Sequence, residues 1–298
     1  MNTRKQLQKK VNCLRTLIRL FRRSLDEPKH KDGVECFLDT EAGRIRALAY
    51  NMDTPETLPL YVNLHGGGFV LGRPEMDDPY LLHVAKTAHV KILSPDYSLA
   101  PEAPFPAALN EIFAVVKHVK LHAGEFGIDA QRIALGGHSA GGNFSAAVAL
   151  MDGEKRELGL AGLVLDYPPM DVYTDAGEKP LPKGSIPPKM SRLFDACYCE
   201  NREERKNPLV SPCYATPDQV RLFPPTLVIT AGRDSLCGEA EKFKDLLISA
   251  GVDVTFKRFE DSKHGFTLSN KPDAREGWQL IIDFLNRYLQ EERGRDRE

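Results

Sequence analysis

The sequence predicts an α/β fold in which a mostly parallel sheet is covered by helices on both faces. From Val34 onward, short apolar runs of strand length alternate with longer helical segments. A chain of 298 residues, 42% of them hydrophobic, is also long enough to bury a large sheet. Strands alternating with helices favour parallel pairing, because the helix returns the chain to the same edge of the sheet. We therefore expect a single domain over residues 1–298.

The expected strands are short apolar runs, and we place them at 45–50, 60–64, 90–93, 133–136, 163–166, 226–230 and 252–256. The expected helices lie between or after them, at 77–89, 107–122, 239–250 and 276–290. In sheets of this kind, ligands bind beyond the carboxyl ends of the strands. That edge is where functional side chains are expected.

Residues 4–25 predict a basic amphipathic helix before the first strand. Its apolar residues follow steps of three and four and are Leu7, Val11, Leu14, Ile18, Phe21 and Leu25. A basic amphipathic helix can lie on an anionic membrane surface. We expect instead that this helix docks its apolar face on the rest of the protein.

A proline-rich interruption breaks the alternation later in the chain. Residues 168–225 hold 11 of the 21 prolines and one short expected helix near Met190–Cys197. A long insertion between two core strands is typical of a lid over a site. We expect a helical cap from about 1–35 and about 168–224, and a core from about 36–167 and 225–292.

Composition excludes several classes of partner. Forty basic residues against 42 acidic ones leave a formal charge of −2, which gives no reason to expect nucleic acid. The chain shows no integral membrane segment of 18 apolar residues and no apolar core of a secretory signal. We expect a cytoplasmic protein that acts on a small neutral molecule.

The six cysteines and the glycine-rich runs exclude the common cofactor motifs. The cysteines are scattered without C-x-x-C spacing, so we expect reduced thiols and no metal; Cys197 and Cys199 lack a second ligand pair at suitable spacing. Neither glycine-rich run matches a nucleotide-binding pattern.

The run Gly137-His138-Ser139-Ala140-Gly141 follows an expected strand and precedes a helix-forming run of small residues. A G-x-S-x-G turn holds its serine in a strained conformation that exposes the hydroxyl. The pattern predicts a nucleophilic Ser139.

A serine nucleophile needs a base and a carboxylate that orients the base. Asp234 follows the expected strand at 226–230, and His264 follows the one at 252–256. Taken singly, they would be a turn aspartate and a surface histidine. Together with Ser139 they give the order Ser, Asp, His of α/β-hydrolases.

A glycine run after the strand at 60–64 predicts a site for a developing oxyanion. His65-Gly66-Gly67-Gly68 offers backbone N–H groups without side chains in the way, and the amide of Ala140 directly follows the nucleophile. A flexible turn is the alternative use of three glycines, but it rarely needs all three.

The chain resembles the bacterial hormone-sensitive-lipase-like esterases of the α/β-hydrolase superfamily (alpha/beta hydrolase fold-3). The resemblance spans about residues 58–270, and the motifs that match are 65–70, 96–102 with 105–108, 137–143, 234–236 and 264–266. It implies an α/β-hydrolase fold with an eight-stranded sheet and a helical cap, no cofactor, and hydrolysis of carboxylic esters with short acyl chains.

The resemblance also assigns roles to matching residues. Ser139 would be the nucleophile, His264 the general base and then acid, and Asp234 its orienting partner. The amides of Gly66, Gly67 and Ala140 would bind the oxyanion. It further implies pairing of two copies, through the last strand and helix, as a homodimer.

Two positions depart from the family pattern. Position 138 is His where the family often has Asp, and position 98 is Ser where it often has Arg. We expect His138 to support the nucleophile from behind or to face solvent, and not to take part in catalysis.

The sequence therefore predicts a serine carboxylesterase that works through an acyl-enzyme. A non-catalytic small-ligand receptor on a hydrolase scaffold is the alternative from another class, although receptors of this kind tend to lose the base. An amidase or lactonase with the same triad is a third possibility that sequence does not separate.

Overall fold

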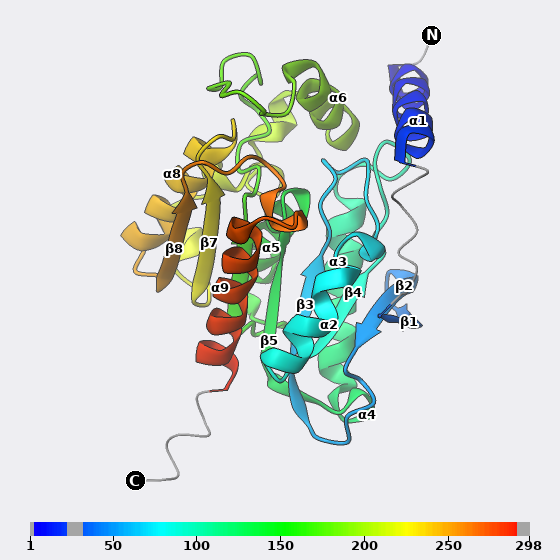
Figure 1. Cartoon of the computed structure of the whole chain (residues 1–298), viewed down its shortest axis with the longest axis vertical. Coiled ribbons are helices and arrows are strands. Elements are labelled where there is room, and N and C mark those ends of the chain that lie inside the picture. Colours follow the sequence, from blue (N-terminus) through cyan, green and yellow to red (C-terminus); the bar gives the residue numbers. More distant parts are fainter. Residues whose placement is uncertain (1–2, 23–31, 291–298) are drawn as a thin grey trace.

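The computed structural model describes residues 3–22 and 32–290, and these form one eight-stranded sheet with helices on both faces (Figure 1). The strands are β1 (Val34–Thr40), β2 (Gly43–Tyr50), β3 (Leu58–Leu64), β4 (Lys91–Pro95), β5 (Ile128–His138), β6 (Gly162–Asp166), β7 (Thr226–Ala231) and β8 (Val254–Phe259). Their order across the sheet is β1-β2-β4-β3-β5-β6-β7-β8.

Strand direction confirms the predicted mostly parallel sheet. Only β2 runs against its neighbours, β1 and β4, whereas the pairs from β4 through β8 are all parallel. The carboxyl ends of β3, β5, β7 and β8 therefore meet at one edge of the sheet.

Burial along the strands follows their place in the sheet. Every residue of β3, β4, β6 and β7 is buried, because helices cover both faces of these central strands. The edge strands β1 and β8 keep exposed residues among buried or half-buried ones. The near-continuous apolar sequence of the central strands reflects this two-sided burial.

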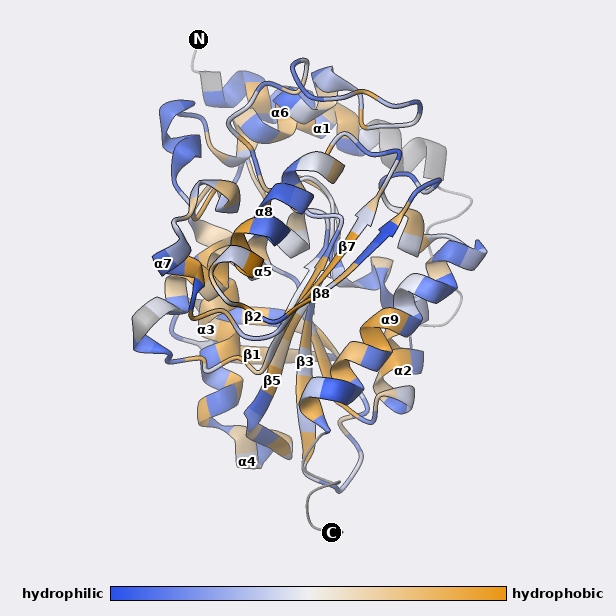
Figure 2. Ribbon diagram, turned by 90° about the vertical axis from the view of Figure 1, so that its left-hand side faces the viewer, coloured by the Kyte–Doolittle hydropathy of each residue, from blue (hydrophilic) through white to orange (hydrophobic). Residues whose placement is uncertain are grey.

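The helices form two layers (Figure 2). Apolar residues of α2 (Asp78–Thr87) and α9 (Pro272–Leu289) form one core cluster against the sheet. Those of α3 (Ala107–Leu121), α5 (Ala140–Asp152) and α8 (Cys237–Ser249) form another on the opposite face. The short helices α4 (Ala123–Phe126) and α7 (Pro217–Val220) lie in connections between the larger elements.

Helix α1 (Thr3–Arg22) packs beside α6 (Pro188–Tyr198), and both lie at the top of Figure 1. Val11 is completely buried in a small apolar cluster with Val70, Phe194 and Cys197. The guanidinium of Arg15 donates to the carbonyl oxygen of Val70 at 2.9 Å. The described part of the apolar side, formed by Leu7, Val11 and Leu14, therefore docks on the protein, as expected. The side chains of Ile18, Phe21 and Leu25 lie outside the described residues.

Several boundaries differ from the sequence prediction. No strand was expected before residue 45, yet β1 forms an edge hairpin with β2. The exposed polar residues of β1 weaken its apolar pattern. Strand β8 begins at Val254 rather than at Val252, because Val252 still donates to Leu247 O at the end of α8. The expected helix at 4–25 extends to Arg22, and residues 23–25 lie outside the described part.

Within the described residues, no helix is both long and apolar enough to cross a bilayer. All six cysteines are free thiols.

We predict that Val11→Asp detaches α1 from α6, because an unpaired carboxylate in this apolar cluster is costly to bury. Trypsin should then cleave within α1 at least about tenfold faster, which corresponds to a loss of roughly 1.4 kcal/mol in docking free energy. The matched control is Thr16→Asp, which introduces the same charge at an exposed position of the same helix. Equal cleavage rates in both variants would contradict the docking.

Candidate active site

Ser139 lies at the turn between β5 and α5, with backbone angles φ 52° and ψ −118°. Few non-glycine residues adopt a positive φ, so the surrounding structure must hold this conformation. Its backbone N–H donates to the carbonyl oxygen of Asp166 at 2.8 Å, which fixes the turn to the end of β6. This is the geometry of a nucleophile elbow.

The two glycines of the serine turn are required by its close approach to β3. A Cβ at Gly137 would lie 2.2 Å from the carbonyl oxygen of Leu64, and one at Gly141 would lie 2.1 Å from the same atom. No side chain fits at either position without moving backbone. The G-x-S-x-G spacing therefore follows from packing of the turn against the last residue of β3.

His264 and Asp234 converge on Ser139 from two other loops. The imidazole Nε2 of His264 lies 2.9 Å from Ser139 Oγ, and its Nδ1 lies 2.6 Å from Asp234 Oδ2. Asp234 is 3% exposed, and its Oδ1 accepts the N–H of Leu236 at 3.2 Å. The structure thus brings together the three side chains that the sequence singled out.

This arrangement provides for proton transfer from the serine hydroxyl. Nε2 of a neutral His264 can accept the Ser139 proton while the Asp234 carboxylate accepts the Nδ1–H and stabilises the resulting imidazolium. The ring of Tyr167 contacts His264 edge to face, with centroids 5.0 Å apart, and limits its rotation. The site can activate a serine oxygen for attack on a carbonyl carbon.

The glycine run after β3 lies against the serine turn. A Cβ at Gly66 would be 3.4 Å from Ser139 Cβ. Gly67 has φ 132° and Gly68 has φ 58°, both in the left-handed region that favours glycine. A Cβ at Gly67 would lie 2.0 Å from Leu71 O. Close contacts or positive φ angles therefore favour glycine at all three positions.

His65 holds the start of this glycine run. It is completely buried, its ring stacks on Tyr97 with centroids 4.2 Å apart, and the Tyr97 hydroxyl donates to its carbonyl oxygen at 2.6 Å. Burial lowers the pKa of His65, which favours the neutral ring, and Nδ1 lies 2.8 Å from Gly66 O. His65 therefore stabilises the start of the glycine run through its packing and polar contacts.

Ala140 is the first residue of α5, and the first N–H groups of a helix have no partner within that helix. The positive end of the helix dipole adds to the attraction for a negative oxygen at this point. Together with the neighbouring glycine run, this amide provides the kind of donors that an oxyanion requires.

Helix α6 covers the glycine run. Phe194 lies so close to Gly68 that a Cβ there would be 2.2 Å from its ring, and Tyr198 stacks on Phe69 with centroids 4.0 Å apart. Ser139 is only 7% exposed. Ser139 is therefore buried, whereas the side chain of His264 is 15% exposed.

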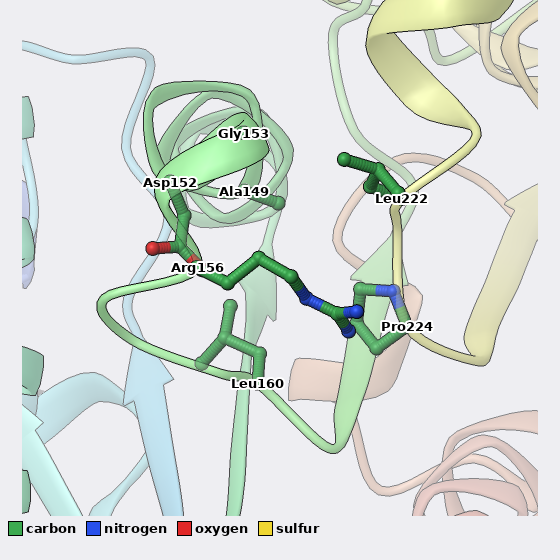
Figure 3. Close-up of a pocket in the computed structure, with 7 residues that line it drawn as sticks. All are labelled: Ala149, Asp152, Gly153, Arg156, Leu160, Leu222 and Pro224. Carbon is green, nitrogen blue, oxygen red and sulfur yellow. The ribbon is translucent and has the colours of Figure 1, made fainter.

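Two hollows lie elsewhere on the surface. One of about 370 Å³ separates α1 from the end of α6, and Leu7, Phe105 and Tyr198 are among its lining residues. The other lies at the far end of α5, where Asp152, Arg156 and Pro224 frame about 10 Å³, space for a single water at most (Figure 3). Neither contains Ser139, Asp234 or His264.

His138 corrects part of the sequence expectation, because it does not face solvent. It is 1% exposed, with Nδ1 2.7 Å from Asp166 Oδ2 and Nε2 3.6 Å from Asp77 Oδ1. Sequence patterns indicated no role for either carboxylate or for Thr267, whose hydroxyl donates to Asp166 Oδ2 at 2.8 Å. A usable signal for Asp166 was an acidic residue ending the apolar run 163–165 at the same sheet edge as Ser139.

Ser98, the other departure from the family pattern, binds a carboxylate instead. Its backbone N–H and hydroxyl donate to Glu111 at 2.7 and 2.6 Å. Among the described residues, no three His, Cys, Asp or Glu side chains form a group suited to a metal ion.

Comparisons with known proteins show which family and which structures this chain is similar to. A family model described as alpha/beta hydrolase fold matches residues 61–268. The carboxylic ester hydrolase LipN of Mycobacterium tuberculosis is 33% identical over 245 residues, which cover 80% of this chain and 65% of LipN. A thermostable esterase from Pseudomonas putida superposes with a TM-score of 0.84 and 26% identity, covering 94% of this chain and 90% of the esterase.

An AB hydrolase superfamily protein of Schizosaccharomyces pombe is 29% identical over 214 residues, which cover 69% of this chain and 62% of that protein. The matched region thus spans slightly less than two thirds of the length of these two curated relatives, LipN and the yeast protein.

We predict that Gly67→Ala lowers the free energy of unfolding by about 1–3 kcal/mol, the scale of a residue held in a sparsely populated backbone region. The added methyl would also overlap the Leu71 carbonyl oxygen. The control is Gly124→Ala in α4, where nothing lies within 4 Å of the new atom. Urea unfolding of both variants measures the difference, and similar stabilities would contradict the steric argument.

Proposed function

This chain belongs to the alpha/beta hydrolase fold family, and we propose that it is a serine carboxylesterase acting on small esters. The single observation that supports this most is the continuous hydrogen-bonded series from Ser139 Oγ through His264 to Asp234. A catalytic base is retained within reach of the nucleophile, which a non-catalytic receptor would not need.

In the proposed first half-reaction, Ser139 Oγ attacks the ester carbonyl carbon while its proton passes to His264 Nε2. The tetrahedral intermediate then collapses, the bond to the alcohol oxygen breaks, and His264 returns the proton to that oxygen. The products of this step are the alcohol and an acyl group bound to Ser139.

In the second half-reaction, water attacks the acyl carbon and gives one proton to His264. The acid leaves as the Ser139 oxygen takes that proton back, which restores the starting state. Throughout, Asp234 holds the imidazole in the tautomer that accepts at Nε2.

We assign the oxyanion contacts to the backbone N–H groups of Gly66, Gly67 and Ala140. The close approach of Gly66 to Ser139, and the start of α5 at Ala140, support this assignment. Losing one such donor typically costs roughly 10² to 10³ in rate.

The proposed substrates carry short acyl chains, because aromatic rings lie against the glycine run next to Ser139. Phe194 covers the glycine run from α6, and Ser139 is 7% exposed. An aromatic group comprising Phe69, Phe144 and Tyr198 fills the space next to the same run. A long chain would require displacement of these rings.

The assignment of 1–35 and 168–224 as a cap, and the pairing of two copies as a homodimer, stay predictions. The packing of α1 against α6 supports a joint unit of the two segments.

We predict that Ser139→Ala lowers kcat for p-nitrophenyl butyrate by at least about 10³-fold, because no other oxygen is positioned to form the acyl-enzyme. Ser249→Ala, at an exposed position on α8, is the control and should retain wild-type kcat. Comparable turnover by Ser139→Ala would remove the assignment. Binding of esters without turnover by the wild type would favour a receptor, and turnover confined to amides or lactones would assign another substrate class.

We predict that Phe194→Ala shifts the preference toward longer acyl chains by opening the space above Gly68. The measurement is kcat/KM for p-nitrophenyl esters from C2 to C12, with an expected rise of about tenfold in the C8 to C2 ratio, a scale set by a few buried methylenes. Phe256→Ala on the edge strand β8 removes a partly exposed ring far along the sheet and is the control. An unchanged chain-length profile in Phe194→Ala would show that α6 does not limit the acyl chain.

A further inference from the structure

A buried polar network lies directly behind the serine turn. Its centre is His138, the residue before the proposed nucleophile. Nδ1 of His138 lies 2.7 Å from Asp166 Oδ2, and Nε2 lies 3.6 Å from Asp77 Oδ1. All three side chains are 1% exposed or less. Apolar side chains would cost less free energy to bury here than these polar groups. The presence of the polar groups therefore requires an explanation.

The same carboxylate joins the serine turn to the histidine loop. The hydroxyl of Thr267 donates to Asp166 Oδ2 at 2.8 Å, and the Tyr167 hydroxyl contacts Thr267 Oγ1 at 2.6 Å. Thr267 lies three residues after His264. Asp166 therefore binds, through one oxygen, both the residue before the nucleophile and the loop that carries the base.

Backbone contacts tie the network to both loops. Ser139 N–H donates to Asp166 O at 2.8 Å, and the indole N–H of Trp278 donates to Thr267 O at 3.0 Å. The Trp278 ring also contacts the His138 ring, with centroids 5.1 Å apart. A displacement of His138 would therefore alter the position of both the serine turn and the loop that carries His264.

The negative charges of two nearby carboxylates attract a protonated His138 and so favour a single position of its ring. Burial by itself would lower the pKa of His138, but the carboxylates of Asp77 and Asp166 outweigh it and raise that pKa above its ordinary value. The contribution of this imidazolium to stability is therefore lost as pH rises through the raised pKa of His138. The titratable groups around this ring are Tyr61, Asp77, Asp166, Tyr167 and, through Asp166, His264.

We propose that His138 is a positioning residue that holds the serine turn and the His264 loop in register, through Asp166 and Thr267. This inference rests on the proposed esterase function and deepens it. The distance from His264 Nε2 to Ser139 Oγ would then depend on contacts that no substrate touches. Two loops that are 125 residues apart in sequence would be set against each other by one shared carboxylate oxygen.

The test uses variants at both ends of the network in the full chain. His138→Asn keeps a donor near Asp166 but loses the charge and the reach toward Asp77. Thr267→Val removes the hydroxyl at nearly constant shape, and Thr267→Ser restores it. Val116→Ala, a buried change on α3 outside the network, is the control for general loss of stability.

We expect kcat for p-nitrophenyl butyrate to fall about tenfold to a hundredfold in His138→Asn and Thr267→Val, the scale on which a misplaced catalytic group costs rate. KM should change less than twofold, because the network does not touch the substrate. Thr267→Ser should recover wild-type kcat. The double variant should lose less than the product of the single losses, because both changes break one linkage.

Three further readouts separate positioning from stability. The rate at which diethyl p-nitrophenyl phosphate modifies Ser139 should fall with kcat, and the downfield proton NMR signal of His264 Nδ1–H should shift or broaden in both variants. In the wild type, kcat should decline on the alkaline side as His138 loses its proton, and this decline should be absent in His138→Asn. Val116→Ala should lower the melting temperature and leave all three readouts unchanged.

The proposal is overturned if His138→Asn and Thr267→Val fold, melt lower and yet keep kcat, the modification rate and the His264 signal of the wild type. If His138→Asn does not fold, the comparison of Thr267→Val with Thr267→Ser tests the proposal by itself. A wild type that neither hydrolyses esters nor reacts at Ser139 refutes the proposed function instead, and the NMR signal then still reports whether His138 orders the His264 loop.

Discussion

The contact on which the site depends is the packing of the serine turn against the last residue of β3. The carbonyl oxygen of Leu64 lies where side chains at Gly137 and Gly141 would have to be. Because β3 and β5 are parallel neighbours in register at Leu64 and Gly137, their ends arrive together at the sheet edge. The glycine run that follows β3 therefore lies beside Ser139 as a direct consequence of this strand pairing.

Several residues with positive φ lie next to this contact. Ser139 has a positive φ, as do Gly67, Gly68 and Phe69 in the adjacent run. Such conformations persist only where the surroundings fix them, and here the central strands, buried over their whole length, supply a rigid base. The loops that carry Asp234 and His264 leave the same edge from β7 and β8, so the three side chains meet at hydrogen-bond distance.

The two histidines on either side of the serine turn differ in burial and in the number of carboxylates around them. In front of it, His264 is held by one carboxylate and remains accessible, with a side chain 15% exposed. Behind it, His138 is enclosed by two carboxylates that are both 0% exposed. Burial and charge thus differ between two histidines close to Ser139: His264 is the proposed proton acceptor, and the carboxylates around His138 raise its pKa.

Apolar runs and glycine positions are local properties, so they were enough to predict most of the sheet, its mostly parallel direction and the residues at the serine turn. The sequence also pointed to Asp234 and His264, since each follows an expected strand. Edge strand β1, the true start of β8, and the network of Asp77, Asp166 and Thr267 around His138 were decided only by tertiary structure. Nothing local in the chain distinguishes a buried His138 from an exposed one: its surroundings come from β6, from the residue before α2 and from the segment before α9, and only the folded sheet brings these together.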